Sequence, residues 1–372
     1  MEKQETFPRL QSLDALRGFD MLFIMGGGAF FVALATLIPT PFFQGIAAQM
    51  EHVYWNGCHL EDMIFPTFLF IAGISFPFSL AKQRSQGKSR KAIYLKIIRR
   101  GLTLVLLGFL YNGILSHLDF TTARYASVLG RIGLAWMFAA LIFVDTKAST
   151  RIWVTLLCLL GYWLMLNYIP VPDADGAGKY TMEGSFTGYF DRICLPGQLY
   201  KEVHDPEGLL GTIPAIATAL LGMFCGEFVK INSSKWSGNK KTITMIIAAV
   251  VLIIIGRIWN LAFPINKNLW SSSFVCFVGG ISMLCFAIFY YIVDVRNCRG
   301  WTFFFRVIGM NSITIYLAQK FINFHNFNDQ VFGGLAALVP HSASSLVTAT
   351  CYILTCWLFL YILYRQKIFL KV

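Results

Sequence analysis

The chain alternates between long apolar segments and short polar segments over most of its length. A helix needs about 20 mostly apolar residues to cross a bilayer. Ten segments have this character, and we predict that each forms a spanning helix: residues 19–38, 62–81, 94–114, 125–144, 152–169, 208–229, 242–260, 270–293, 302–320 and 344–364. The pattern therefore predicts an all-α polytopic membrane protein, a bundle of about ten transmembrane helices in contact with the lipid bilayer.

The composition supports this prediction. Of 372 residues, 56% are hydrophobic and only 13% are charged, whereas soluble domains carry roughly 25% charged residues. No polar stretch is long enough to fold as a separate soluble domain, so we predict one transmembrane domain over residues 1–372. The N-terminus lacks a small-residue cleavage site after a short apolar core, and the first apolar segment is expected to stay as a spanning helix.

The basic residues predict how the chain is oriented. If the N-terminus is cytoplasmic, about three quarters of the 31 basic residues fall in cytoplasmic segments, with the densest group at residues 82–100. Ten spans with both termini in the cytoplasm fit this distribution. The net charge of +12 is then an orientation signal, and it does not indicate a nucleic-acid site, because the basic residues are divided among loops without interleaved aromatic residues.

The nine cysteines do not indicate a disulfide framework or a metal site. Most lie inside apolar segments, where cysteine behaves as a small buried apolar residue. There is no CxxC motif, and His52 and His59 have only carboxylates as close polar neighbours. We therefore predict no bound metal.

The segment that follows the first predicted helix has the strongest chemical character. It reads EHVYWNGCHLEDMIFPTFLF, and its polar residues run directly into the second predicted helix. Ionisable groups are costly at the edge of a membrane, which indicates a functional role. On the predicted topology every histidine falls on the outer side, which suggests a polar, partly acidic outer vestibule: His52, His59, His117, His204, His325 and His341.

His52 is the leading catalytic candidate, because imidazole titrates near neutrality and can act as a base or a nucleophile. Either Glu51 or Asp62 could orient its ring, and Asn56 could donate a hydrogen bond to an oxyanion. Asp62 has a structural alternative, since a carboxylate at the start of a helix caps free backbone N–H groups. The alternative for His52 is that it is a loop histidine at a helix start, without a catalytic role.

Several polar residues within the apolar segments are further candidates. Asp20 precedes the Gly26–Gly28 run, and an acid at that depth is expected to face protein or water. Arg131 and Arg257 lie near helix ends, where they either extend to the interface or bind a phosphate or carboxylate. Asn311 either joins helices or contacts a ligand. We take Arg131, Arg257 and Asn311 as candidate cofactor-binding residues.

Five segments carry a family resemblance: SLDALRG, HVYWNG with EDMIFPTFLFIAGIS, DPEGLLGTIPAIATALLGMFCG, NKNLWSSSFVCFVGGISML and IGMNSITIYL. In this order they resemble the heparan-α-glucosaminide N-acetyltransferase family of transmembrane acyltransferases and its bacterial relatives, from about Leu10 to the C-terminus. The resemblance implies transfer of an acetyl group from cytoplasmic acetyl-CoA to an amino sugar on the far side of the membrane. It maps the family's catalytic histidine onto His52 and the aspartate of its DxxFPxF motif onto Asp62.

The chain departs from that family pattern in its first predicted helix. The lysosomal member has an asparagine just before the glycine run, whereas this chain reads FIMGGG, with Asp20 as the nearest polar residue. The acceptor is therefore left open as an amino sugar or a sugar hydroxyl. The absence of the lysosomal member's N-terminal luminal region suggests a compact bacterial form in the inner membrane, and a homodimer is left open.

Two hypotheses follow. The first is an acetyl-CoA-dependent N- or O-acetyltransferase in which His52 acts as a base or carries the acetyl group, supported by Asn56, Asp62 and Asp20. The second is a secondary transporter of a sugar-like or anionic solute with an outer polar vestibule. The lack of an internal repeat that pairs the two halves counts against the transporter. On the first hypothesis, Glu51, His59 and Glu61 are expected to be solvated loop residues.

Overall fold

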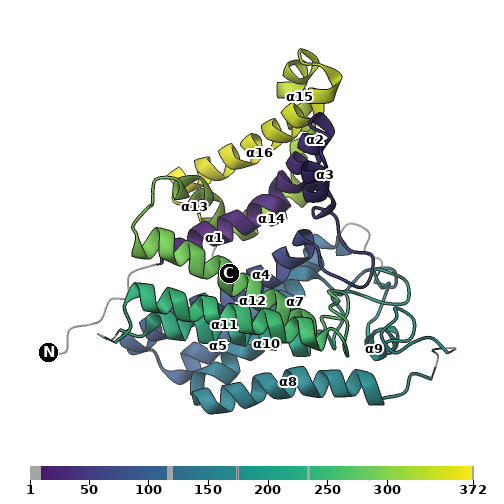
Figure 1. The fold of residues 1–372 in the computed structure, drawn as a ribbon, viewed down its shortest axis with the longest axis vertical. Coiled ribbons are helices and arrows are strands. Elements are labelled where there is room, and N and C mark those ends of the chain that lie inside the picture. The colour runs from purple at the N-terminus through teal and green to yellow at the C-terminus, as the bar shows by residue number, and fades with distance from the viewer. Residues whose placement is uncertain (1–9, 115–119, 173, 175, 233–234, 371–372) are drawn as a thin grey trace.

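The computed structural model describes residues 10–114, 120–172, 174, 176–232 and 235–370. Regular structure in these ranges is helical, and the two isolated β-bridges join Gly57 to Asn266 and Arg124 to Gly197. The helices (Figure 1) are α1 (Gln11–Leu22), η1 (Phe23–Gly27), α2 (Gly28–Leu37), α3 (Pro41–Ala48), α4 (Leu60–Ser85), α5 (Arg90–Tyr111), α7 (Val128–Asp145), α8 (Ala148–Tyr168), α9 (Phe186–Cys194), α10 (Thr212–Lys230), α11 (Gly238–Trp259), α12 (Ser272–Phe289), η2 (Tyr290–Val295), α13 (Thr302–Met310), α14 (Ser312–Phe321), α15 (Phe324–Ala337) and α16 (His341–Arg365).

Eight of the ten predicted segments correspond to helices that are long and apolar enough to cross a membrane. The third predicted segment is also a helix, α5, but its first half carries five basic residues among its first eleven, which lowers its apolar character. The ninth is divided into α13 and α14 at Asn311, whose backbone is not helical. The prediction of an all-α polytopic membrane protein is confirmed, while the orientation of the termini stays a prediction.

The first span contains a break that the hydrophobic pattern does not predict. Between α1 and α2 the chain forms a π-helical turn at Phe23–Gly27, and Gly26 has a φ of 116°. This backbone region is disfavoured for residues with a side chain. A Cβ on Gly26 would lie 3.1 Å from a ring carbon of Tyr352 in α16. The glycine run therefore allows both the turn and the close approach of α16.

Helix α4 lies at the centre of the bundle and is the most buried of the eight candidate spans. It packs tightly on α10 because small residues face each other. A Cβ on Gly73 would lie 2.3 Å from the carbonyl oxygen of Ala219, and one on Gly222 would lie 2.1 Å from that of Phe70. Such close approach of backbones is typical of helix packing in membranes. The position of α4, and of the residues at its N-terminus, is thus firmly fixed.

Three connections meet at the end of the bundle where α4 begins, and we call them the polar cap: residues 49–59, the described part of 170–211, and 260–271. Trp55 Nε1 donates to the carbonyl oxygen of Tyr180 at 2.7 Å, and Lys201 Nζ donates to that of Tyr54 at 3.0 Å. His204 Nε2 lies 3.0 Å from the carbonyl oxygen of Asn268. These bonds join segments far apart in sequence into one layer around His52.

Candidate active site

His52 and Asp62 form a hydrogen-bonded pair at the N-terminus of α4. His52 Nδ1 lies 2.8 Å from Asp62 Oδ1. The two side chains differ sharply in exposure, since His52 is 59% exposed and Asp62 only 2%. The arrangement holds the imidazole at its Nδ1 edge and leaves more than half of the side chain exposed.

The fold of the loop explains why Asp62 is fixed in place. Asp62 lies in the first turn of α4, and its Oδ2 accepts the backbone N–H of His59 at 3.0 Å and that of Val53 at 3.2 Å. A carboxylate is also stabilised by the positive end of the helix dipole. Asp62 therefore caps the helix and orients His52 at once. Glu51, the other carboxylate considered for this role, has an exposed side chain.

Lys267 completes the cluster from a distant part of the chain. Its Nζ lies 3.3 Å from Asp62 Oδ1 and 3.2 Å from His52 Nδ1. An unprotonated Nδ1 and a carboxylate oxygen 2.8 Å apart would repel each other. We therefore infer that Nδ1 carries the proton and donates a hydrogen bond to Asp62 Oδ1. Nε2 is then the basic nitrogen on the exposed edge. Lys267 had no assigned role in the sequence, although it lies within the NKNLWSSS segment of the resemblance.

Asn56 is held by Asn266, the residue that precedes Lys267 in the chain. Asn266 Nδ2 donates to Asn56 Oδ1 at 3.1 Å, and the Gly57 backbone N–H donates to the carbonyl oxygen of Ile265 at 2.8 Å. With its oxygen engaged, the Asn56 amide presents Nδ2 as a donor, as a role in oxyanion binding requires. Cys58 is not a competing nucleophile, because burial raises the pKa of its thiol to about 12 and only the thiolate is reactive.

Asp20 and Glu61 are the other carboxylates near this site. Asp20 in α1 is 6% exposed, and its Oδ2 has no hydrogen-bond partner within the described residues. Glu61 is also partly buried, with its Oε2 enclosed and without a partner in the same ranges. The prediction that Glu61 is a solvated loop residue is wrong, because α4 begins at Leu60 and places Glu61 in its first turn, against Gly28.

The structure gives the three candidate cofactor-binding residues structural contacts. Arg131 is buried and donates to the carbonyl oxygens of Pro206 at 2.5 Å and Gly208 at 2.6 Å. Asn311 separates α13 from α14 and donates to the carbonyl oxygen of Ile368 at 3.1 Å. Arg257 is exposed in the last turn of α11, over the ring of Phe277. Nη1 and Nη2 of Arg131 and Nδ2 of Asn311 thus donate to backbone carbonyl oxygens, while Arg131 Nε has no partner within the described residues. The role of the three residues toward the acetyl donor stays a prediction.

The histidines do not form one cluster. His52, His59 and His204 lie in the polar cap, while His325 stacks on Tyr352 at a centroid distance of 4.2 Å, and His341 begins α16. His117 lies outside the described residues. Within those residues no group of three His, Cys, Asp or Glu side chains could hold a metal ion. Of the histidines assigned to the predicted vestibule, His52, His59 and His204 lie in the polar cap, whereas His325 and His341 do not.

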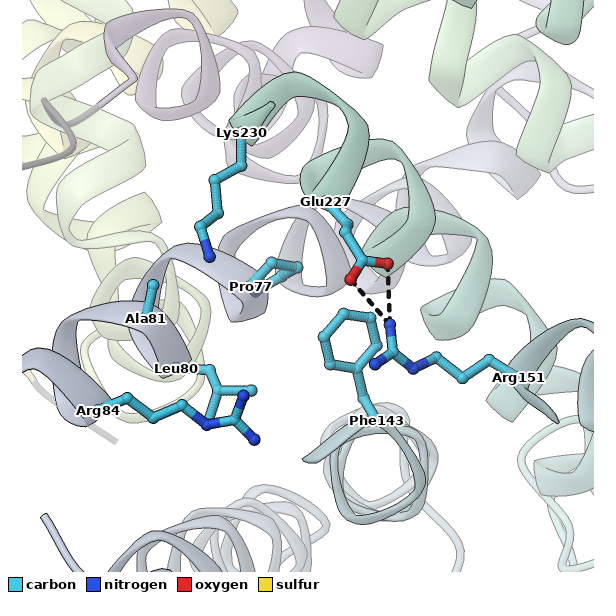
Figure 2. A pocket seen from close by; sticks show the side chains of 8 residues that line it. All are labelled: Pro77, Leu80, Ala81, Arg84, Phe143, Arg151, Glu227 and Lys230. Carbon is cyan, nitrogen blue, oxygen red and sulfur yellow. Dashed lines mark hydrogen bonds and ion pairs between the residues drawn. The ribbon is translucent and has the colours of Figure 1, made fainter. Parts of the chain in front are cut away.

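A pocket lies near the opposite end of α4 (Figure 2). Its lining combines apolar side chains with three cations and one carboxylate: Pro77, Leu80, Ala81, Arg84, Phe143, Arg151, Glu227 and Lys230. Arg151 binds both oxygens of Glu227, and Arg84 donates to the carbonyl oxygen of Val144 at 2.6 Å. On the predicted orientation this basic pocket faces the cytoplasm, one bilayer away from His52.

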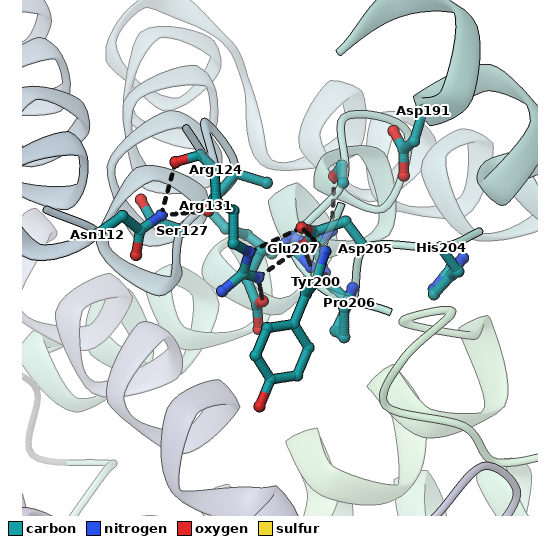
Figure 3. Close-up of polar contacts among 12 residues, drawn as sticks. Asn112, Arg124, Ser127, Arg131, Asp191, Tyr200, His204, Asp205, Pro206 and Glu207 are labelled. Carbon is teal, nitrogen blue, oxygen red and sulfur yellow. Dashed lines mark hydrogen bonds and ion pairs between the residues drawn. The ribbon is translucent and has the colours of Figure 1, made fainter. Parts of the chain in front are cut away.

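A buried polar network stabilises the polar cap (Figure 3). Arg124 donates to both oxygens of Asp205, at 2.8 and 2.7 Å, and also pairs with Glu207. Although burial alone would lower it, the pKa of the Arg124 guanidinium is raised by these two carboxylates. Burial raises the pKa of Asp191 to about 7 and lowers that of His204 to about 4. His204 is therefore neutral near pH 7 and acts as a structural donor to Asn268.

We expect replacement of Arg124 by methionine to destabilise the protein by about 3 kcal/mol, because it leaves the fully buried carboxylate of Asp205 without its partner. The matched control is Arg90→Met, which breaks an ion pair to Asp145 in which the arginine is 80% exposed. That change should cost about 1 kcal/mol or less. Thermal unfolding in detergent, followed by tryptophan fluorescence, measures both. Equal losses in the two variants would contradict the structural role of the network.

Together, the helices and the histidine cluster define a polytopic membrane protein with a candidate acid–base site at one end of its bundle. Comparison with known proteins gives a particular resemblance. The chain is 28% identical to human heparan-alpha-glucosaminide N-acetyltransferase and 27% identical to the mouse protein, in each case over 98% of its length. It spans about 60% of the length of these relatives. Residues 9–120 also match a family described as a domain of unknown function, DUF5009. The resemblance indicated by the sequence motifs is confirmed.

Proposed function

We propose that this protein is a membrane acetyltransferase that moves an acetyl group from acetyl-CoA to a sugar acceptor, with His52 as its central catalytic residue. The observation that carries the proposal is the His52–Asp62–Lys267 cluster. A buried carboxylate holds Nδ1 of an exposed imidazole, which leaves Nε2 available as a base or nucleophile. The similarity to N-acetyltransferases over nearly the whole chain supports the same chemistry.

The proposal requires a donor and an acceptor that meet from opposite sides of the membrane. The predicted cytoplasmic end carries most of the basic residues, including Arg84 and Arg151 at the pocket, and would attract the polyanionic donor. The polar cap would admit the sugar from the other side. We propose a bacterial inner membrane as the location, with the cap facing outward.

Two chemical routes suit the site. In the first, Nε2 of His52 removes a proton from the acceptor as it attacks the thioester, and Asn56 Nδ2 stabilises the oxyanion. In the second, His52 attacks the thioester and carries the acetyl group before the acceptor takes it. Rapid-quench trapping of acetylated protein in the absence of acceptor would support the second route, and ternary-complex kinetics without trapped acetyl-protein would exclude it.

Incubation of the purified chain in detergent with labelled acetyl-CoA and a panel of amino sugars tests the proposal. Because no gradient exists in detergent, an acetyltransferase should yield acetylated sugar, whereas a transporter has no product to form. The matched comparison is uptake of the same sugars into proteoliposomes. Uptake without any dependence on acetyl-CoA, together with no product in detergent, would favour the transporter instead.

A further inference from the structure

Two side chains converge on one oxygen atom of Asp62, and the routes above give a task to only one of them. Asp62 Oδ1 lies 2.8 Å from His52 Nδ1 and 3.3 Å from Lys267 Nζ. Asp62 Oδ2 accepts the backbone N–H groups of His59 and Val53. Both oxygens of the carboxylate are therefore occupied, and Lys267 is the cation that balances its charge.

The backbone that carries Lys267 is fixed by hydrogen bonds in and beside the polar cap. Asn266 is fully buried. Its Nδ2 donates to Asn56 Oδ1, and its Oδ1 accepts the backbone N–H of Leu269 at 2.9 Å. From α8, the hydroxyl of Tyr162 donates to the carbonyl oxygen of Leu269 at 2.6 Å. The Lys267 side chain is only 17% exposed, so a well-held backbone brings a largely enclosed ammonium group to the site.

Asp62 and Lys267 are the charged groups within hydrogen-bonding distance of the His52 ring in the described part of the chain. Lys267 Nζ lies 3.2 Å from His52 Nδ1. Because that nitrogen carries the proton, the contact is electrostatic and not a hydrogen bond. The wider surroundings of the cluster include further titratable groups: Cys58, Glu61, Lys201 and Arg257. Lys267 is thus the cation in direct contact with the ring.

The two charges act on the imidazole in opposite directions. A carboxylate beside Nδ1 favours a positively charged ring, whereas an ammonium group 3.2 Å from the same atom disfavours it. Asp62 alone would orient the ring of His52 and would also hold a second proton on it. With Lys267 present, the carboxylate keeps its orienting hydrogen bond, and its attraction for positive charge on the ring is offset.

We propose that Lys267 is a positioning residue that keeps Nε2 of His52 free of a proton between turnovers, by opposing positive charge on the ring that Asp62 orients. This inference rests on the proposed function and adds the group that controls the protonation state of its central residue.

Both proposed routes place a positive charge on the ring. In the first, a neutral acceptor gives its proton to Nε2 as it bonds to the acetyl carbon and the C–S bond breaks, and the CoA thiolate then takes that proton. In the second, Nε2 bonds to the acetyl carbon as the thiolate leaves, and the ring stays positive until the acceptor takes the acetyl group and releases its own proton to solvent. Lys267 shortens the life of either cation, because the proton or the acetyl group leaves the ring more readily.

Three substitutions of Lys267 separate its charge from its hydrogen bond. Lys267→Gln keeps a donor for Asp62 without the charge, Lys267→Met removes both, and Lys267→Arg keeps both. The measurement is kcat/KM as a function of pH, with labelled acetyl-CoA and a sugar acceptor in detergent. In the two neutral variants the ring gains its proton more easily, so the acidic limb should move to higher pH by about one unit. The rate on that limb then falls by about tenfold and recovers at high pH, while Lys267→Arg follows wild type.

Lys201→Gln is the matched control. It removes a cation from the same polar cap, where Lys201 Nζ donates to the carbonyl oxygen of Tyr54, and it leaves the ion pair between Lys267 and Asp62 in place. Its acidic limb should stay at the wild-type position. A displacement equal to that of Lys267→Gln would show that the general charge of the cap, and not Lys267, sets the profile, and would overturn the inference.

A titration followed by NMR makes the test independent of turnover. In histidine-labelled protein the ring signal of His52, identified by its absence from His52→Gln, should titrate about one unit higher in Lys267→Gln than in wild type. An unmoved limb and ring signal in the folded neutral variants, or an equal displacement in Lys267→Arg, would overturn the inference. Failure of both neutral variants to fold would also overturn it, since Lys267 would then act on stability.

The same set of variants distinguishes this inference from the proposed function. If His52→Ala is inactive while the neutral variants of Lys267 keep the wild-type profile, only this inference fails. If His52→Ala remains active, the proposed function fails.

Discussion

Replacement of His52 by alanine is expected to lower kcat for acetyl transfer by about three orders of magnitude, because it removes the exposed imidazole that Asp62 holds at Nδ1. Initial rates with labelled acetyl-CoA and an amino sugar, in detergent, measure the loss. KM for acetyl-CoA should change little, since the histidine acts on the acetyl group and the acceptor.

His59→Ala is the matched control, because it removes the same ring from the same loop seven residues later. The Nδ1 of His59 lies 2.8 Å from the backbone carbonyl oxygen of Glu51. The backbone N–H of residue 59, which donates to Asp62 Oδ2, is kept when the side chain is removed. We expect its rate to stay within about threefold of wild type. Equal losses of activity in the two variants would show that acetyl transfer depends on the integrity of the loop and not on the imidazole of His52.

Asp62→Asn should lower kcat by about a hundredfold to ten-thousandfold while the fold is retained. The asparagine keeps the shape of the side chain but can turn its amide donor toward Nδ1 of His52. The ring would then carry its proton on Nε2, the nitrogen that must accept one. The loss should therefore appear in kcat, with KM for acetyl-CoA close to wild type.

The melting temperature must be recorded for Asp62→Asn as well, because Asp62 also caps α4 and binds Lys267. Glu51→Gln, which changes an exposed carboxylate in the same loop, should leave both the rate and the melting temperature unchanged. A folded Asp62→Asn protein with nearly normal kcat would contradict the orienting role of Asp62.

The sequence identified the central pair but not its whole environment. His52 and Asp62 lie ten residues apart at a helix start, so local pattern was enough to bring them together. Lys267 could not be placed, because it comes from a loop 205 positions away from Asp62 and reaches the site only through the tertiary fold. Glu61 was misassigned for a local reason: one helical turn decides whether its carboxyl faces solvent or α2.

The contacts of Arg131 could not be predicted from the sequence either. Arg131 lies in an apolar segment, and the loop that follows Asp205 supplies two carbonyl oxygens that accept hydrogen bonds from its Nη1 and Nη2. Long-range backbone contacts of this kind leave no local sequence signal. The long helices, in contrast, follow from apolar segments alone, apart from the interruptions at Gly26 and Asn311, where backbone geometry overrides hydropathy. The shorter helices α3, α9 and α15 lie in connections for which no helix was predicted.

We propose that His52 transfers an acetyl group between substrates on opposite sides of the membrane. Sealed proteoliposomes of one orientation, with labelled acetyl-CoA on the pocket side and an impermeant amino sugar on the polar-cap side, test it most directly. We predict acetylated sugar on the cap side with wild-type protein and a loss of about a thousandfold with His52→Ala. Product in equal amounts with both proteins, or transfer only when both substrates share one side, would contradict the account.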